Sequence, residues 1–356
     1  RSAAKRARNS NWWKTTIMSH AIFVSKYVYQ ELQRGTCHHG APIICRAERI
    51  DNMKVLGLNF GRKNGNCKTF LSAAIESAKE AGAEVEVIDT IDKEIRHCIG
   101  CGSCSRGLQS GKGQIRCCLK DDYEAISDAV LAADAIIVAA PVYVLVPSGQ
   151  FKNFLDRFGP AHDKAFMLFE NELRKDNKGE ELNPDCLKRH LVSYISVGGA
   201  TTQNWVSYGI PGMNLFGLSL NMKVVDQLDA YAAYVPDNRE RLIAESHKIG
   251  TRITEAYGKK TSEITWESDP GVCPVCHCRE ITLNGSTTVS CPVCGIYGTL
   301  KVEGDRVSVE FSEEEQNRSR LKFTGVLEHQ VEQGRKDRYP RFDEYVEKFL
   351  AIQDEM

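Results

Sequence analysis

Three cysteines in the middle of the chain have the spacing of ligands to an iron–sulfur cluster. Cys98, Cys101 and Cys104 are each separated from the next by two residues. Iron–sulfur clusters are held by thiolates, often by a CxxCxxC run and one more distant cysteine. A single CxxC would be weaker evidence, because zinc sites and thioredoxin-like motifs share it. The series of three therefore favours a cluster, and Cys117 or Cys118, after a glycine-rich stretch, could supply the fourth thiolate.

A second set of cysteines lies near the C-terminus. Cys273 and Cys276 form one CxxC pair, and Cys291 and Cys294 form another. Two such pairs, separated by the length of a short β-hairpin, are a strong indication of a tetrahedral four-thiolate site. This geometry suits zinc or iron, and the segment resembles both zinc ribbons and rubredoxin-like modules. Zinc would act as a structural ion and iron would relay single electrons, while Cys278 is a spare thiol or an alternative ligand.

The composition limits the classes of protein that come into question. The chain has 356 residues, 42% hydrophobic content and a net charge of −1, which fits two compact units or one domain with additions. Its fourteen cysteines are clustered and no clear signal peptide precedes them. We therefore expect metal binding in a reducing compartment, the cytoplasm, rather than disulfides. We expect no membrane span, because no apolar stretch is long enough, and the balanced charge gives no reason to expect nucleic-acid binding.

The first 52 residues differ from the rest of the chain. Residues 1–30 contain no acidic side chain and several basic ones. A targeting or membrane-surface segment is one interpretation, and an extension upstream of a fold that begins at Met53 is the plainer one. Residues of metal-ligand type occur there without a second CxxC pair to complete a site, namely Cys37, His38, His39 and Cys45.

Between residues 53 and 260, apolar runs alternate with amphipathic stretches. Predicted strands cover residues 55–59, 84–89, 135–140, 191–197 and 222–227. Predicted helices cover residues 69–81, 121–133, 148–158, 203–218 and 237–257. The fully apolar run 135–140 is typical of a central parallel strand. The alternation predicts an α/β fold, with a doubly wound, five-stranded parallel sheet in flavodoxin-like order and a ligand at the carboxyl ends of the strands.

The remaining segments define the domain organisation. Residues 160–190 are charged and longer than a link needs, so we expect a solvated loop there, with an active-site lid or a dimer arm as alternatives. After Thr261 the α/β pattern stops, and Ser312 with Glu315 forms a predicted capping box. We divide the chain into an extension (1–52), an α/β domain (53–260) with a cysteine-rich loop (97–120), a four-cysteine metal ribbon (268–311) and a C-terminal helical segment (312–356).

Two loops at predicted strand ends have the residue types of ligand-binding loops. Residues 59–67 follow the first strand, and their small residues let backbone N–H groups turn toward an anion at the next helix N-terminus. Arg62 adds positive charge where a phosphate would lie. Pro141, Val142 and Tyr143 follow the third strand and could press an aromatic side chain and the backbone against a flat ring system. The plainer alternatives are a simple turn and a tyrosine that only packs.

Residues 53–257 resemble the NADPH-dependent FMN reductases among the flavodoxin-like proteins. The resemblance rests on residues 62–66 (RKNGN), 141–143 (PVY) and 152–157 (KNFLDR). The run of three cysteines, followed by Asp121 and Asp122, is similar to the iron–sulfur flavoproteins within this family. The chain departs from the family in two ways. The family usually has Ser or Thr where Phe60 and Cys67 stand, and in the iron–sulfur flavoproteins the fourth cysteine follows the third more closely.

The resemblance implies FMN as a cofactor, and a [4Fe–4S] cluster on Cys98, Cys101, Cys104 and either Cys117 or Cys118. It implies that the FMN phosphate is held around Phe60, Gly61, Arg62, Asn64, Asn66 and Cys67. It implies that the flavin ring is held by Pro141, Val142, Tyr143 and Val144, with Gly198 and Gly199 as the third loop. It also implies a homodimer or homotetramer, and a family in which NAD(P)H stacks on the flavin.

We therefore expect an FMN-dependent oxidoreductase, linked to NAD(P)H or ferredoxin, that couples two-electron flavin chemistry to one-electron transfer through the cluster. No Ser-His-Asp triad or carboxylate pair competes with this interpretation, and Tyr143 is the candidate side chain on the substrate side. One alternative is an electron carrier that exchanges electrons with a ferredoxin-like protein or a partner enzyme. The other is a cluster-free NAD(P)H:quinone or nitro-compound reductase.

Overall fold

The computed structural model describes residues 52–265 and 272–354. All of these residues belong to one compact unit. The predicted extension, with Cys37, His38, His39 and Cys45, lies outside the described residues apart from Asn52. Among the helices that are described, none combines the length and the apolar character needed to cross a membrane.

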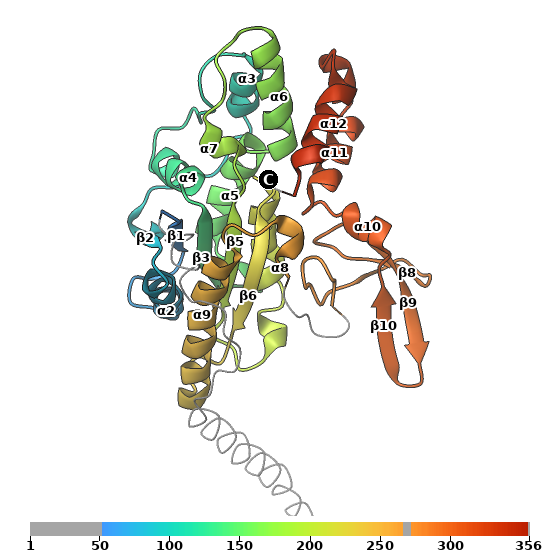
Figure 1. The fold of residues 1–356 in the computed structure, drawn as a ribbon. Coiled ribbons are helices and arrows are strands. Elements are labelled where there is room, and N and C mark those ends of the chain that lie inside the picture. The colour runs from blue at the N-terminus through green and yellow to red at the C-terminus, as the bar shows by residue number, and fades with distance from the viewer. Residues whose placement is uncertain (1–51, 266–271, 355–356) are drawn as a thin grey trace, which may run out of the picture. The chain divides into compact units, whose positions relative to one another are not determined.

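A five-stranded parallel sheet forms the centre of the α/β domain, as predicted (Figure 1). The strands lie in the order β2-β1-β3-β5-β6, which is the flavodoxin-like order. A two-residue strand, β4 (Val146–Pro147), pairs antiparallel with the end of β3. All five parallel strands therefore have their carboxyl ends at the same edge. Their bounds are β1 Lys54–Asn59, β2 Glu84–Asp89, β3 Ala135–Tyr143, β5 Leu191–Val197 and β6 Lys223–Ala230.

Helices cover both faces of this sheet, because alternate residues of a strand point to opposite sides. Leu56, Ile136 and Val192 face one layer, formed by α4 (Tyr123–Ala132), α5 (Gly149–Ala161) and α8 (Gly209–Leu218). On the opposite face, Val55 and Ile137 pack against α2 (Asn66–Glu80) and α9 (Pro236–Ala256). The predicted helix 203–218 begins later than expected, because Gln203–Trp205 forms a separate 3-10 turn before α8.

Residues 160–190 are not the solvated loop that we expected. They form α6 (Lys164–Asp176) and α7 (Pro184–Leu187), and one face of α6 is buried. Phe169 is fully buried against Phe342, Tyr339 and Phe349, with ring centroids 4.7, 4.8 and 5.3 Å away. The prediction from sequence missed the apolar stripe of α6, because charged residues surround it in the sequence. The helices that cover this stripe lie about 150 residues later in the chain.

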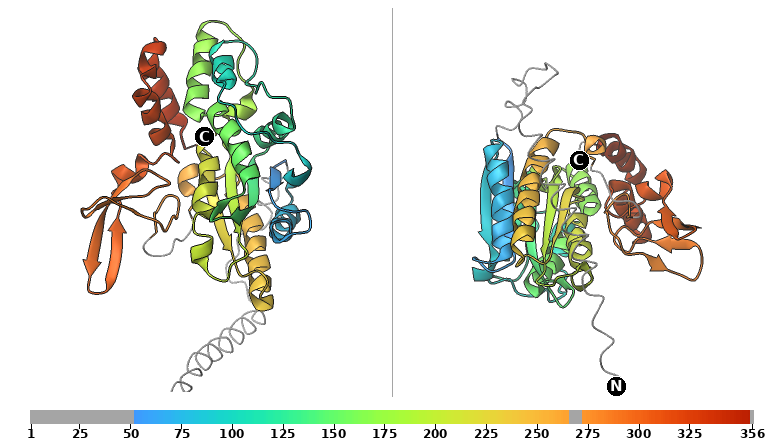
Figure 2. Two further views of the ribbon diagram at one scale, coloured as in Figure 1. Left: turned by 180° about the vertical axis from the view of Figure 1, so that it is seen from behind. Right: turned by 90° about the horizontal axis from the view of Figure 1, so that it is seen from below.

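The partners of α6 are the C-terminal helices α11 (Phe323–Glu332) and α12 (Phe342–Ile352), which lie beside it in Figure 2. A buried ionic contact reinforces the apolar one. Glu170 of α6 is 1% exposed and accepts hydrogen bonds from Arg338 and from the Tyr339 hydroxyl, the latter at 2.9 Å. Helix α6 therefore provides the surface against which the C-terminal helices pack.

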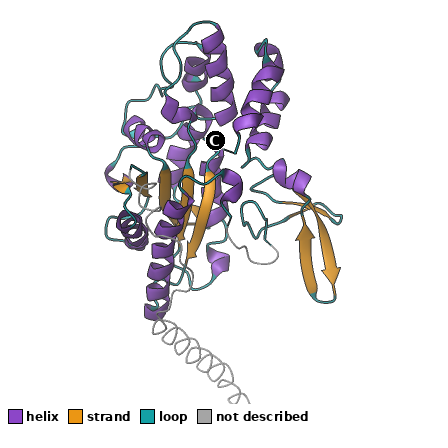
Figure 3. Cartoon of the chain, viewed as in Figure 1, coloured by secondary structure: helices purple, strands orange, loops and turns teal. Residues whose placement is uncertain are grey.

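The four-cysteine module is a small antiparallel sheet in the order β10-β9-β8-β7, with the long hairpin β9–β10 visible in Figure 3. Its strands are β7 Thr282–Leu283, β8 Thr288–Ser290, β9 Tyr297–Glu303 and β10 Arg306–Glu310. Ser312 caps α10 (Glu313–Asn317) by accepting from Glu315 N–H, as predicted. The Glu315 carboxylate does not complete the predicted capping box by returning to Ser312, because it accepts from Tyr297 N–H instead.

Removing the Phe169 ring tests the role of α6. We expect Phe169→Ala to lower the free energy of unfolding by about 3–5 kcal/mol, because it leaves a cavity among three aromatic rings. The measurement is a urea titration followed by fluorescence, with Leu283→Ala, an exposed apolar residue of β7, as the control expected to change stability by less than about 0.5 kcal/mol. Equal midpoints for the two variants would contradict the packing described for α6.

Candidate functional site

The loop between β1 and α2 is built to receive an anion. Gly65 precedes α2, no side chain caps that helix, and its first turn contains no acidic residue. The first-turn N–H groups and the positive end of the helix dipole are therefore available to a negatively charged group. Gly61 approaches the helix so closely that an added Cβ would lie 2.7 Å from Cys67. A side chain at Gly61 would thus displace the loop from the helix.

The predicted phosphate residues divide into two sets. Arg62 and Asn64 are exposed and Asn66 is half-buried, so their side chains can face a ligand. Phe60 and Cys67 are buried, with Phe60 edge-on to Phe151. Burial raises the pKa of the Cys67 thiol to about 12, which keeps it neutral. The side chains that replace the family's usual hydroxyls therefore point into the core, and only the backbone of Phe60 and Cys67 can serve a phosphate.

Arg239 of α9 also reaches this loop, although its position in the sequence gives no sign of it. Its guanidinium donates to the Asn66 side chain and, at 3.3 Å, to the Thr69 hydroxyl. The packing of α9 on α2 brings this positive charge to the N-terminus of α2. Only the tertiary contact between two helices about 170 residues apart could reveal it.

The ends of β3 and β5 form the edge predicted to hold a flat ring. Tyr143 is 59% exposed and Val144 is 93% exposed. Val144 and Leu145 have φ angles of 50° and 73°, in the left-handed region that β-branched residues such as valine rarely adopt. Gly198 donates its N–H to Ala230 O, and a side chain there would collide with Val206. The loops after β3 and β5 are thus held in defined positions, with an exposed aromatic ring beside them.

The residues at this edge fit FMN. An uncapped helix N-terminus and a tight glycine turn suit its phosphate, and backbone loops with exposed Tyr143 suit its ring. The carboxyl edge of a parallel sheet is where folds of this type bind ligands.

The cysteine-rich loop gathers its thiols at a different place. A single small pocket is lined by all five of them, together with Arg157 and Pro160, namely by Cys98, Cys101, Cys104, Cys117 and Cys118. Cys101 Sγ lies 3.3 Å from Cys118 Sγ. Hydrogen bonding with Ser103, and then with Cys118, lowers the pKa of Cys101 to about 7. The loop thus brings the predicted cluster ligands to one pocket. Both Cys117 and Cys118 line it, so the choice between them as the fourth ligand stays open.

Arg157 provides a physical test of what this pocket can hold. Its side chain is 1% exposed, donates to Asp121 at 2.6 Å and lies 4.0 Å above the Tyr123 ring. Its Nε and second terminal nitrogen are buried without a hydrogen-bond partner. A buried guanidinium with unpaired donors favours negative charge beside it. Thiolates or an anionic iron–sulfur cluster in the neighbouring pocket would supply that charge, so the pocket fits such a group.

The C-terminal cysteines form a closed four-thiolate site. The sulfur atoms of Cys273, Cys276, Cys291 and Cys294 lie within 4.8 Å of one another, and all four residues are buried. Cys273 and Cys294 are 3.7 Å apart, and Cys276 and Cys291 are 3.5 Å apart. Cys278 is buried nearby, and its thiol donates to Glu280 at 3.0 Å. This donor set suits a tetrahedral zinc or iron ion.

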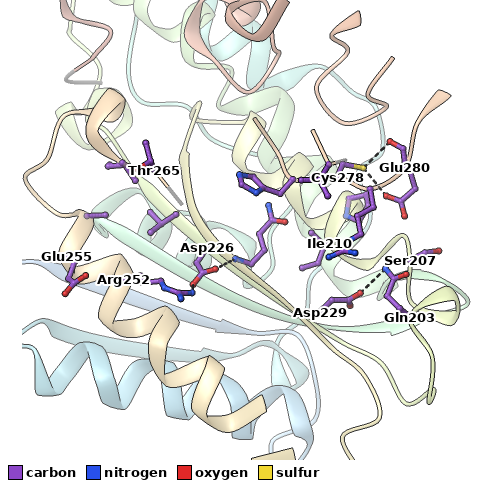
Figure 4. Close-up of a pocket in the computed structure, with 18 of the residues that line it drawn as sticks. Gln203, Ser207, Ile210, Asp226, Asp229, Arg252, Glu255, Thr265, Cys278 and Glu280 are labelled. Atoms are coloured by element: carbon purple, nitrogen blue, oxygen red, sulfur yellow. Dashed lines mark hydrogen bonds and ion pairs between the residues drawn. The ribbon is translucent and has the colours of Figure 1, made fainter. Parts of the chain in front are cut away.

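A cavity of about 780 Å³ lies between the outer edge of β6, α8, α9 and the ribbon loop (Figure 4). This volume is in the range of small-molecule sites. Gln203 and Asp229 mark its end near the carboxyl edge of the sheet, and Cys278 and Glu280 belong to the ribbon side. Gln227 of β6 donates to Cys276 O at 3.1 Å, which joins the edge strand to the ribbon. The prediction from sequence did not find this cavity.

A pair of cysteine variants tests the four-thiolate site. We expect Cys273→Ser to lose the bound metal and to unfold the ribbon locally, because so small a sheet depends on its ion. Cys278→Ser, the matched control, should keep the same metal content as the parent protein. The measurement is metal content by mass spectrometry. Loss of the ion in both variants would show that Cys278 is a ligand.

Comparison with known proteins agrees with this geometry. Residues 53–172 match the NADPH-dependent FMN reductase family. The flavone synthase cfoJ of Aspergillus candidus is 29% identical over 296 residues, which cover 79% of this chain and 90% of that protein. A solved flavone reductase superposes with a TM-score of 0.66 and 26% identity, over 85% of this chain and 93% of its own.

Iron–sulfur flavoproteins match a shorter part of this chain than the flavone synthase does. One from Archaeoglobus fulgidus is 38% identical over 109 residues, which cover 30% of this chain and 46% of that protein. The flavodoxin-like sheet, the anion-binding loop between β1 and α2 and these matches all indicate a flavin-binding protein. The chain is a flavin-dependent oxidoreductase whose residues 53–172 match the NADPH-dependent FMN reductase family.

Proposed function

We propose that this oxidoreductase uses FMN to interconvert a flat, conjugated aromatic ketone of flavone type and its dihydro form. The observation that carries the proposal is the likeness, over most of the chain, to a flavone synthase and to a flavone reductase. A flavone contains a carbon–carbon double bond conjugated to a carbonyl, and such a bond gains or loses two electrons and two hydrogens. This is two-electron chemistry of the kind that a bound flavin supplies.

The carboxyl edge of the sheet supports a flat substrate. Exposed aromatic side chains lie at the end of β3 and in the segments after β5 and β6, with exposed fractions of 59% for Tyr143, 67% for Trp205, 50% for Tyr208 and 65% for Tyr234. Exposed aromatic clusters of this kind mark binding surfaces. Aromatic rings stack on flat conjugated systems, so the edge suits a substrate lying against a flavin.

In this proposal the backbone of residues 60–67, with Arg62, Asn64 and Asn66, holds the FMN phosphate, and Arg239 orients Asn66. The flavin ring lies against residues 141–144 and the Gly198–Gly199 loop. We keep the predicted domain borders in this proposal, with a flavin domain at 53–260, a four-cysteine zinc or iron module at 268–311 and the helical segment at 312–356. A homodimer or homotetramer in the cytoplasm completes the proposal.

We further propose that Cys98, Cys101, Cys104 and either Cys117 or Cys118 hold a [4Fe–4S] cluster. The shared pocket, the unpaired donors of Arg157 and the partial match to iron–sulfur flavoproteins support it. The pocket includes Asp156, Arg157 and Pro160, which lie seven to eleven residues after the start of α5 at Gly149. At 1.5 Å per residue this is about 10–16 Å along the helix. That separation favours the supply of single electrons from a ferredoxin-like donor over contact with the substrate, whereas NAD(P)H would reduce the flavin itself.

The substrate assignment is tested with FMN-loaded protein reduced by dithionite without oxygen. We expect it to convert flavone to a product two mass units heavier, because the double bond takes up two hydrogens. Trp205→Ala should raise KM about tenfold and leave FMN content unchanged, since the indole lies on the substrate side. The measurement is product formation by liquid chromatography and mass spectrometry. A protein that reduces quinones or nitro compounds but no flavone would favour the cluster-free reductase instead.

The cluster is tested by iron and acid-labile sulfide per chain after anaerobic purification. About four of each are expected, and Cys101→Ala should lose both while FMN stays bound. Cys186→Ala, which removes a buried thiol that does not line the cysteine-rich pocket, should keep them. Full iron and sulfide in Cys101→Ala would show that the ligand assignment is wrong. Absence of sulfide in the parent protein would leave a flavin reductase without a cluster.

A further inference from the structure

The cysteine-rich loop carries a positive charge that the chain as a whole does not. Residues 93–120 contain six Lys or Arg and one acidic residue, Glu94, which gives a net charge of +5 with His97 neutral. The full chain has a net charge of −1. The loop that gathers the five thiols therefore presents positive charge to solvent, because all six basic residues are exposed, namely Lys93, Arg96, Arg106, Lys112, Arg116 and Lys120.

Neighbouring acidic side chains cancel only a small part of this charge. Arg116 pairs with two carboxylates at 2.6 and 2.9 Å, and Arg96 has longer contacts to two others at 3.7 and 3.8 Å. The Asp121 carboxylate, which follows the loop, is buried against Arg157 at 2.6 Å and does not reach solvent. Within the part of the chain that the structure describes, the other four basic residues form no ion pair, namely Lys93, Arg106, Lys112 and Lys120.

Three of the six basic residues flank the cysteine pocket. The guanidinium of Arg106 lies so near Gly102, a residue of the pocket lining, that a Cβ added there would be 3.0 Å from it. Lys120 directly follows Leu119, which also lines the pocket. Arg96 donates to the Lys120 carbonyl at 3.4 Å, so these two residues lie side by side. Positive charge is therefore present beside the pocket on more than one of its walls.

The pocket itself presents an apolar side chain and several thiols to solvent. Ile99 is 57% exposed and lines the pocket between two of the cysteines. Cys98, Cys101 and Cys118 are exposed as well. Protein interfaces combine an apolar centre with a polar rim, and exposed Ile99 with its basic neighbours has this pattern. Electron transfer between proteins needs a redox group near the surface, and a group held by these thiols would lie there.

We propose that Ile99, with Arg96, Arg106 and Lys120 around it, forms a docking surface for an acidic one-electron carrier protein of ferredoxin type. This rests on the proposed function, since the group held by the pocket thiols receives the electron. In each encounter the reduced centre of the carrier loses one electron, and the group in the pocket gains it. Two encounters supply the two electrons that reduce the bound flavin, and the two protons come from solvent.

Charge and composition favour this partner over other occupants. A two-fold contact between copies of the chain places a surface against itself, which would bring the same positive charges together. Residues 93–120 contain no Phe, Tyr or Trp, so the loop lacks the aromatic platforms on which single-stranded nucleic acids stack. Complementary charge instead steers brief encounters between proteins, and electron-transfer complexes need only a small interface.

The test is the binding of an oxidised plant-type [2Fe–2S] ferredoxin, an acidic protein, to full-length, FMN-loaded protein purified without oxygen. We expect Arg106→Glu with Lys120→Glu to raise Kd about tenfold at low salt, because complementary charge is lost. Added salt should weaken binding of the parent by screening the same charges. The measurement is isothermal titration calorimetry, with iron, sulfide and FMN content compared in every sample.

Two further variants serve as controls. Arg106→Lys with Lys120→Arg keeps both charges and should bind ferredoxin as the parent does. Lys79→Glu with Lys248→Glu makes the same change of charge at exposed residues of α2 and α9, which cover the other face of the sheet, and should also bind as the parent does. Iron and sulfide equal to the parent's in the Arg106→Glu, Lys120→Glu variant would show that weaker binding does not come from a lost cluster.

The choice of electron donor separates this inference from the proposed function. With dithionite, a small reductant that needs no docking surface, the Arg106→Glu, Lys120→Glu variant should reduce flavone at the parent's rate. With reduced ferredoxin its rate should fall about as much as its affinity. Ferredoxin binding that follows the charge, without flavone reduction from either donor, would refute the flavone substrate and support the docking surface.

Three results would overturn the docking surface. The first is a parent protein that does not bind ferredoxin, or a charge-reversed variant that binds it as the parent does. The second is tighter binding of duplex DNA than of ferredoxin, which would assign the surface to nucleic acid. The third is a parent dimer that the charge reversal dissociates, seen by light scattering, which would assign the surface to a second copy of the chain.

Discussion

The parallel pairing of β1, β3 and β5 is the constraint on which the rest of the molecule depends. Because their chain directions agree, the loops after all three strands emerge at one edge. This places the anion-binding turn before α2, the exposed Tyr143 and the Gly198 loop together, although they are far apart in sequence. Helices on both faces bury the apolar strands and leave that edge open to a ligand.

Helix α6 joins the cysteine-rich loop to the C-terminal segment. Arg174, which is 2% exposed, donates to the carbonyls of Leu108 and Gly113 in the cysteine loop, both at 2.9 Å. One turn earlier on the same face of the helix, Glu170 pairs with Arg338, which also donates to Gln109 O. The loop that gathers five thiols is therefore supported by a helix whose own burial depends on α11 and α12. Removal of the C-terminal helices would therefore destabilise α6, and with it the cysteine-rich loop that α6 supports.

The four-cysteine ribbon covers part of an edge that a parallel sheet leaves open. β6 is the last strand of the sheet, and unpaired edge strands invite association with other chains. The ribbon lies beside β6 and contacts it through Gln227 and the Cys276 carbonyl. The contact leaves a cavity rather than a closed interface. A metal-stabilised module thus serves as one wall of a space beside the flavin domain.

Local patterns in the sequence determined the sheet, most helices and both cysteine sets. The apolar run 135–140 is typical of a buried parallel strand, and two CxxC pairs separated by a hairpin length indicate a four-thiolate site wherever the module lies. These features depend on residues close together in the chain, so their periodicity and spacing carry the information.

Tertiary structure alone decided the rest. The apolar stripe of α6 has meaning only beside helices at 323–352, and Arg239 reaches Asn66 only because α9 packs on α2. The unpaired donors of Arg157 depend on what surrounds them, since burial and missing partners are properties of packing. The physical reason is that strand and helix periods are local, whereas desolvation and long-range contacts arise when distant segments meet.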